Sequence, residues 1–136
     1  MKRASSAGKT KRPSIKLQVR LDLPGAGRIG PGKIDLLRQI GEHRSIAAAA
    51  RAMDMSYRRA WLLVDELNNL FSQPLVAKWL GGKLRGGATL TPAGARLVRN
   101  YETVVRRAAE TNRALLSEIL QGTQRASRAV QPRRAA

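Results

Sequence analysis

Residues 45–71 limit the possible folds more than any other part of this 136-residue chain. They contain two helical patterns, one over residues 46–53 and a longer one that ends near residue 71, and Ser45 and Ser56 precede them as N-terminal caps. The turn between them is too short for the second helix to leave the first, and four consecutive alanines allow the two helices to cross closely. This arrangement predicts a helix-turn-helix.

Two further elements are expected before this motif. Apolar and polar residues alternate strictly over residues 15–23, which predicts a half-buried strand ended by Pro24 and the glycines that follow. Pro31 suits the first turn of a helix, and the apolar spacing continues that helix to about His43.

A hairpin and a long helix are expected after the motif. The segment that follows Pro74 predicts a short strand, residues 81–87 a glycine-rich hairpin tip, and residues 88–90 a return strand. Thr91 is a good cap, and a single helix is predicted from about Pro92 to Gln121. The expected fold is therefore mostly α with a small β-wing, a winged helix-turn-helix with a long C-terminal helix.

Charge is concentrated at the ends of the chain, which has a net charge of +17. Residues 1–20 carry seven basic and no acidic side chains, and residues 121–136 carry four and none. We expect a disordered basic arm over residues 1–14, one domain with its dimerisation helix over 15–121, and a disordered basic tail over 122–136. Such tails attract phosphates without regard to base sequence.

The first turn of the second motif helix holds the candidate base-reading residues Tyr57, Arg58 and Arg59. In a helix-turn-helix this turn lies in the major groove, where arginine matches the paired acceptors of guanine. Ser45 and Ser56 are expected at the DNA as well, because capped helix N-termini offer backbone N–H groups to phosphates. An ordinary solvated basic helix end is the alternative for the arginine pair, and the accompanying turn and hairpin favour DNA.

The predicted hairpin tip places Lys83 and Arg85 among glycines, where they can reach phosphates or a narrow minor groove. A flexible solvated loop is the alternative. Trp61 is left open between packing against the N-terminal strand, which its size favours, and facing DNA.

An apolar stripe on the last helix predicts a homodimer, because a body this small cannot cover it. Asn112 falls within the stripe and is expected to fix the register of the pair. The expected dimerisation residues are Leu97, Tyr101, Val104, Ala108, Leu115 and Ile119.

Enzymatic classes are disfavoured. The chain has no cysteine and one histidine, His43, for which the sequence supplies no catalytic or metal-binding partner nearby. Asp65 and Glu66 are adjacent and point about 100° apart on a helix, which is unsuitable for paired acid–base work. We expect no catalysis, no metal, no cofactor and no membrane span, and a cytoplasmic, nucleoid-associated protein of bacterial type.

From about Arg28 to Tyr101 the chain resembles the N-terminal domain of ModE-type molybdate-responsive regulators, which is similar to LysR-type DNA-binding domains. The matching strings are GRIG at 27–30 with KI at 33–34, SI at 45–46, AAARA at 48–52, MSYRRAW at 55–61, PLV at 74–76 and LTPAG at 90–94. The resemblance implies a winged-helix dimer in which the last helix helps to pair the subunits.

The resemblance and the residues predict the same function, a sequence-specific DNA-binding transcriptional regulator that reads the major groove with the helix starting at Ser56. The expected partners are double-stranded DNA and a second copy of the chain. Full-length members of the resembled family continue into oxyanion-binding β-domains, whereas a basic tail follows Gln121, so no molybdate site is expected here. The alternative function is an architectural, nucleoid-type protein with little base readout.

Overall fold

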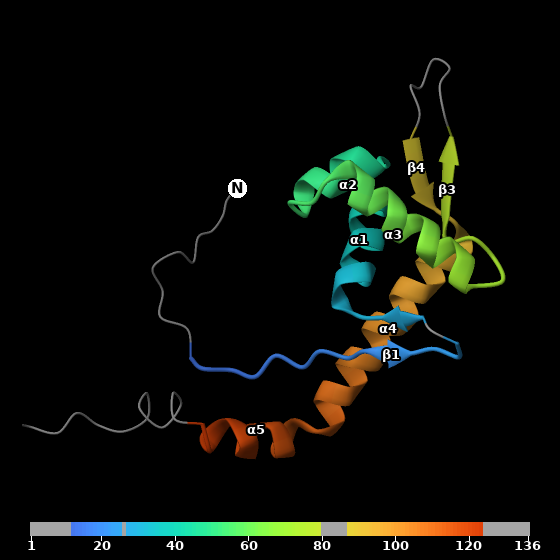
Figure 1. Ribbon diagram of the computed structural model, residues 1–136. Helices are drawn as coiled ribbons and strands as arrows, with labels where there is room; N and C mark the ends of the chain where they lie inside the picture. The colour runs from blue at the N-terminus through green and yellow to red at the C-terminus, as the bar shows by residue number, and fades with distance from the viewer. Residues whose placement is uncertain (1–11, 26, 80–86, 124–136) are drawn as a thin grey trace, which may run out of the picture. The chain divides into compact units, whose positions relative to one another are not determined.

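The computed structural model describes residues 12–25, 27–79 and 87–123. Five helices and two pairs of strands lie in these ranges (Figure 1). Contacts divide the chain into two units, one formed by Gln18–Arg106 and the other by Met1–Leu17 with Arg107–Ala136. The expectation of a mostly α fold with a small β-hairpin is confirmed.

The first three helices form the helical core of the larger unit. They are α1 (Pro31–His43), α2 (Ile46–Ala52) and α3 (Tyr57–Leu70), so the predicted helices are confirmed with nearly the predicted bounds. Their inward faces bury the apolar residues that the helical spacing selected, because residues three and four apart share a face. Fully buried among them are Ile34, Leu36, Leu37, Ile40, Ala49, Ala60, Val64 and Leu67.

The predicted wing strands are also confirmed. Strands β3 (Val76–Trp79) and β4 (Gly87–Leu90) pair in antiparallel register, with Val76 opposite Leu90 and Trp79 opposite Gly87. The hairpin tip between them lies outside the described residues, and with it the predicted DNA contacts Lys83 and Arg85.

The N-terminal strand is much shorter than predicted. Only β1 (Leu21–Asp22) is paired, with β2 (Arg28–Ile29), an element that the sequence did not indicate. Because β2 has only two residues, it pairs with only two residues of the segment 15–23. For this reason the strand predicted over the whole segment is too long. The predicted alternation of exposure along residues 15–23 is nevertheless present.

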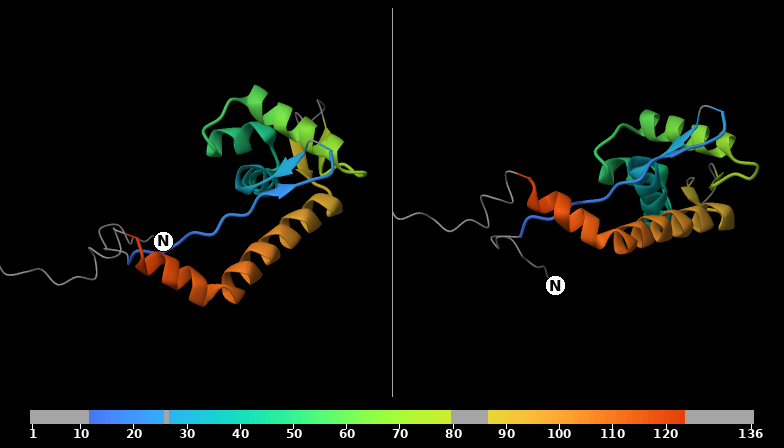
Figure 2. Two further views of the ribbon diagram at one scale, coloured as in Figure 1. Left: turned by 60° about the horizontal axis from the view of Figure 1, so that its bottom comes forward. Right: turned by 90° about the horizontal axis from the view of Figure 1, so that it is seen from below.

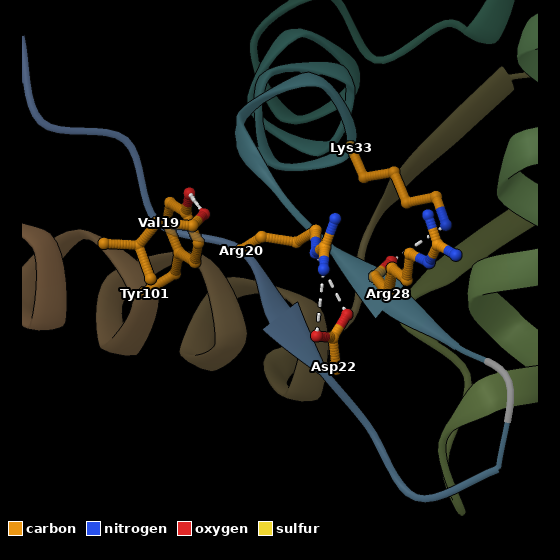
Figure 3. Close-up of polar contacts among 6 residues, drawn as sticks. All are labelled: Val19, Arg20, Asp22, Arg28, Lys33 and Tyr101. Carbon is orange, nitrogen blue, oxygen red and sulfur yellow. Dashed lines mark hydrogen bonds and ion pairs between the residues drawn. The ribbon is translucent and has the colours of Figure 1, made fainter.

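Within the larger unit, residues 18–23 are held by a long-range hydrogen bond and by apolar packing. The hydroxyl group of Tyr101 donates a hydrogen bond of 2.5 Å to the carbonyl oxygen of Val19 (Figure 3). Val19, Leu21 and Leu23 pack partly buried against the core. Figure 2 shows the β1–β2 hairpin close to α3, and there a Cβ atom added at Gly27 would meet the end of the Leu70 side chain.

The start of α4 (Pro92–Thr111) is built as the sequence predicts, with the Thr91 hydroxyl accepting a hydrogen bond from the Gly94 amide at 3.0 Å. At Gly94 the backbone of α4 closely approaches the backbone of Leu75, which lies in the segment between α3 and β3. A Cβ atom added there would lie 2.2 Å from the carbonyl oxygen of Leu75, a contact between backbone groups that no rotamer change relieves. Glycine is therefore required at this crossing.

The prediction of a single helix from Pro92 to Gln121 is wrong. The structure has two helices, α4 and α5 (Arg113–Gln121), with a break at Asn112, whose backbone leaves the helical region at φ −104° and ψ 19°. The Asn112 side-chain amide donates to the Ala108 carbonyl at 2.7 Å, an acceptor that its own backbone N–H also uses. Such local competition with the helical hydrogen bonds is typical of asparagine. Gly122 ends α5 as predicted.

Replacing Gly94 with alanine should lower the free energy of unfolding by about 1–3 kcal/mol, because the added methyl group overpacks the contact with Leu75. Alanine alone would favour the helix by about 1 kcal/mol, so the sign of the effect identifies the clash. Gly32, which has no atom within 4 Å of an added Cβ, is the matched control in α1. Urea denaturation of G94A and G32A measures both, and equal stabilisation by the two changes would contradict the close approach.

Candidate nucleic-acid interface

Helix α3 has an inner face in the core and an outer face in solvent. Ala60, Val64 and Leu67 are fully buried, whereas Tyr57 is 54% and Leu62 48% exposed. Tyr57, Arg58 and Arg59 all lie in the exposed first turn, so the structure brings the three predicted base-reading residues together at one helix end.

Both helices of the motif begin with the predicted serine caps. The Ser45 hydroxyl accepts from the Ala48 amide and the Ser56 hydroxyl from the Arg59 amide, each at 3.0 Å. Neither helix has an acidic residue in its first turn. The positive end of each helix dipole is therefore not neutralised locally, which favours an anion there.

The Arg58 and Arg59 guanidinium groups are available for an external partner. Within the described part of the chain, neither makes an ion pair or a side-chain hydrogen bond. Because Arg58 and Arg59 are adjacent, their side chains diverge by about 100° around the helix axis. The two arginines thus point to different sides of the helix end.

Trp61, for which packing against the N-terminal strand and facing DNA were both open, lies on the outer surface of α3. It is 38% exposed, and the Lys78 ammonium group of β3 lies 4.6 Å from its ring centroid. This cation–π contact joins the outer surface of α3 to the base of the wing. Sequence reasoning missed Lys78, because its role depends on the placement of the hairpin beside α3.

A second contact fixes the wing to the end of α1. Arg44 occupies the left-handed region at φ 56°, and its carbonyl oxygen accepts from the Ala88 amide of β4 at 3.2 Å. The Arg44 guanidinium carbon lies 5.9 Å from the ring centroid of Trp79 in β3. The base of the wing is therefore connected to α1 as well as to α3.

Asn68 positions the start of the wing, a role that sequence reasoning did not predict. Its side-chain oxygen accepts from the amides of Leu75 at 2.8 Å and Val76 at 3.0 Å, and its side-chain nitrogen donates to the Val76 carbonyl at 3.1 Å. These three bonds satisfy backbone groups of two residues that are almost fully buried.

The opposite flank of α3 is fixed by Lys33. Its ammonium group lies 2.6 Å from a Glu66 carboxylate oxygen. It also donates to the Arg28 carbonyl at 2.8 Å (Figure 3). Helix α1 is in turn joined to α4 through Arg38, which pairs with Asp35 and Glu102. Partial burial lowers the pKa of Arg38, but its hydrogen bonds to the two carboxylates outweigh this effect and raise the pKa above its already high ordinary value.

Residues 32–95 match the family model described as bacterial regulatory helix-turn-helix protein, lysR family. These residues form a LysR-type helix-turn-helix domain. The match covers the capped helices, the wing strands and the close crossing at Gly94.

Relatives of the LysR-type domain carry names connected with molybdenum. The chain is 46% identical over 81 residues to the molybdenum-pterin-binding protein MopA of Rhodobacter capsulatus, which covers 60% of this chain and 31% of MopA. It is 37% identical over 84 residues to the molybdenum transport protein ModE of Azotobacter vinelandii, covering 62% of this chain and 31% of that protein. The chain thus spans about a third of the length of these relatives. The resemblance to ModE-type regulators is confirmed for this part.

Among solved structures, the chain is similar to that titled "Crystal structure of CbnR_DBD-DNA complex". The TM-score is 0.49 at 17% sequence identity, over 65% of this chain and 95% of that one.

The predicted dimerisation residues fall into two groups. Tyr101 is buried in the core of the larger unit, against which Leu97 packs partly buried. Val104 is 46% exposed, and Leu115 and Ile119 on α5 are each 60% exposed. Ala108 is half-buried.

Neither a metal-binding cluster nor a membrane-spanning helix is found in the described ranges. These residues hold no group of three or more His, Cys, Asp or Glu side chains that could bind a metal ion. None of their helices is both long enough and apolar enough to cross a membrane.

Replacing Asn68 with alanine should lower the free energy of unfolding by about 2 kcal/mol or more, because each buried amide left without an acceptor costs about 1–3 kcal/mol. N69A is the matched control, since Asn69 is exposed and a surface change there should alter stability by less than about 0.5 kcal/mol. Chemical denaturation compares them. Equal stabilities would show that Asn68 does not fix the wing.

Proposed function

We propose that this chain is a sequence-specific DNA-binding transcriptional regulator that reads the major groove with α3. The observation that carries the proposal is the capped first turn of α3, where Tyr57, Arg58 and Arg59 are exposed and the two guanidinium groups lack partners among the described residues. Arginine can bind the two acceptors of guanine at once, and the same side chain binds phosphate. The match to the family described as bacterial regulatory helix-turn-helix proteins supports the same function.

The wing is proposed to position the protein on the sugar-phosphate backbone. Lys78 and Arg44 lie at its base, each over a tryptophan ring, so both cations have defined positions beside the wing strands. Lys83 and Arg85, at the tip, are proposed to contact phosphates or the minor groove. Phosphate contacts fix the register of a protein on DNA, and base contacts supply the specificity.

We propose no enzymatic step and no cofactor, and we place the protein with the DNA in a bacterial cytoplasm. The absence of a molybdate site from this chain remains a prediction. Calorimetric titration at physiological salt should give no saturable heat with molybdate beyond that with sulfate, and selective binding of molybdate would contradict it.

We further propose that two copies form the DNA-binding unit. Leu115 and Ile119 of α5 are the proposed contact surface, and Val104 of α4 is proposed as a separate contact of the second copy; pairing would bury these exposed apolar side chains. Two recognition helices in a dimer lie about 34 Å apart, one turn of DNA, and so bind a two-part operator.

Light scattering at micromolar concentration should therefore give twice the mass of one chain. L115E should give the mass of one chain, because a buried glutamate on the contact surface would have no partner. S117E places the same charge on an exposed neighbouring position of α5 and is expected to remain dimeric. A monomeric native protein, or loss of the dimer in both variants, would contradict the proposed surface.

Base reading and phosphate attraction should separate in a second pair of variants. R58A should weaken binding to the selected site by about 1–3 kcal/mol and affect a random duplex little, as loss of a base contact does. R85A should weaken both similarly and reduce the salt slope by about one. Titrations of both duplexes across a salt series make the comparison. Equal loss on both duplexes in R58A would make Arg58 a phosphate contact and favour the architectural alternative.

A further inference from the structure

The outer face of α3 carries an apolar side chain, Leu62, that the proposed function leaves without a role. Leu62 is 48% exposed, and Tyr57 and Trp61 on the same helix are also exposed. Isolated exposed leucines are common on protein surfaces, but here three large apolar side chains are exposed on the first two turns of one helix. The remaining exposed large apolar residues of the described ranges lie on α4 and α5.

Leu62 lies on the same face as Arg58. It follows Arg58 by four residues, so the two side chains are neighbours along the helix surface. Both line a shallow hollow whose other walls come from Ser56, Arg59, Leu63 and Glu66. Any base edge that Arg58 reaches therefore brings the adjacent bases toward Leu62.

The chemistry of the major groove offers one apolar partner for such a side chain. Guanine, cytosine and adenine present donors and acceptors there, whereas thymine adds its C5-methyl group. Phosphate oxygens offer no apolar surface, and the thymine methyl group is the apolar partner that the base edges offer in this groove. Burial against a methyl group removes apolar area of both partners from water.

We propose that Leu62 contacts the C5-methyl group of a thymine close to the guanine that Arg58 reads. This inference rests on the proposed function and adds a second specificity-determining residue to it. Four residues advance an α-helix by about 6 Å, and base pairs are spaced by about 3.4 Å. The thymine should therefore lie about two base pairs from the guanine, on either strand.

The test begins with selection of bound sequences from random duplexes by the full chain. Each thymine of the selected site is then replaced singly by uracil, which removes the methyl group and retains the base pair. The guanine read by Arg58 is identified as the position at which R58A no longer discriminates between bases. Binding of the substituted duplexes is measured for the native protein and for L62A and N69A.

The native protein should bind about fourfold more weakly when one thymine near that guanine becomes uracil, the factor expected for one buried methyl group. L62A should bind the thymine and uracil duplexes equally. Alanine is the strongest helix former and Leu62 is exposed, so L62A should keep its fold, which circular dichroism verifies. N69A changes another exposed position of α3 and should retain the native discrimination.

Two results would overturn the inference while the proposed function stands. One is a selected site in which no uracil substitution near the guanine weakens native binding, or in which that region contains no thymine. The other is an L62A variant that discriminates as well as the native protein. If selection enriches no sequence at all, the proposed function fails and the inference fails with it.

Discussion

The backbone of Leu75 is the junction on which the arrangement of α3, the wing and α4 depends. Its amide donates to Asn68 of α3, and its carbonyl oxygen accepts from the Thr91 amide at 2.9 Å and abuts Gly94. A residue with this many backbone neighbours leaves little room for adjustment, because interiors are close-packed. The direction in which the wing leaves α3 follows from these contacts.

On the proposed DNA-binding face, α3 and the base of the wing are therefore held from several sides. Lys33 and Glu66 fix one flank of α3, and the stacking of Lys78 on Trp61 covers the other. Groups that read bases need defined positions, since a contact with two hydrogen bonds tolerates little displacement. The outward arginines and Leu62 are thus presented from a helix whose inner face belongs to the core.

The local features of this fold could be predicted because each is encoded within a few residues. Ser45, Ser56 and Thr91 cap their helices through bonds to amides three residues away, and the apolar spacing identified the buried faces. The two exposed arginines were found in the same way, from their place directly after a cap.

The features that sequence reasoning missed depend on long-range contacts or local competition. The pairing of β1 with β2 and the three bonds of Asn68 require segments to be placed in space first. The break at Asn112 arises because a side chain competes for a helical acceptor, which apolar spacing does not register. The same spacing assigned Tyr101 to a dimer surface, although its hydroxyl and ring belong to the core of one chain.

The hydrogen bond between Tyr101 and Val19 joins residues that are 82 positions apart in the chain. During synthesis the N-terminal segment emerges first, but it lacks this partner until most of α4 has followed. Closing so long a loop is entropically unfavourable until the intervening helices have compacted it. We therefore expect the helical motif to assemble before the segment around Val19 docks, although that segment is synthesised earlier.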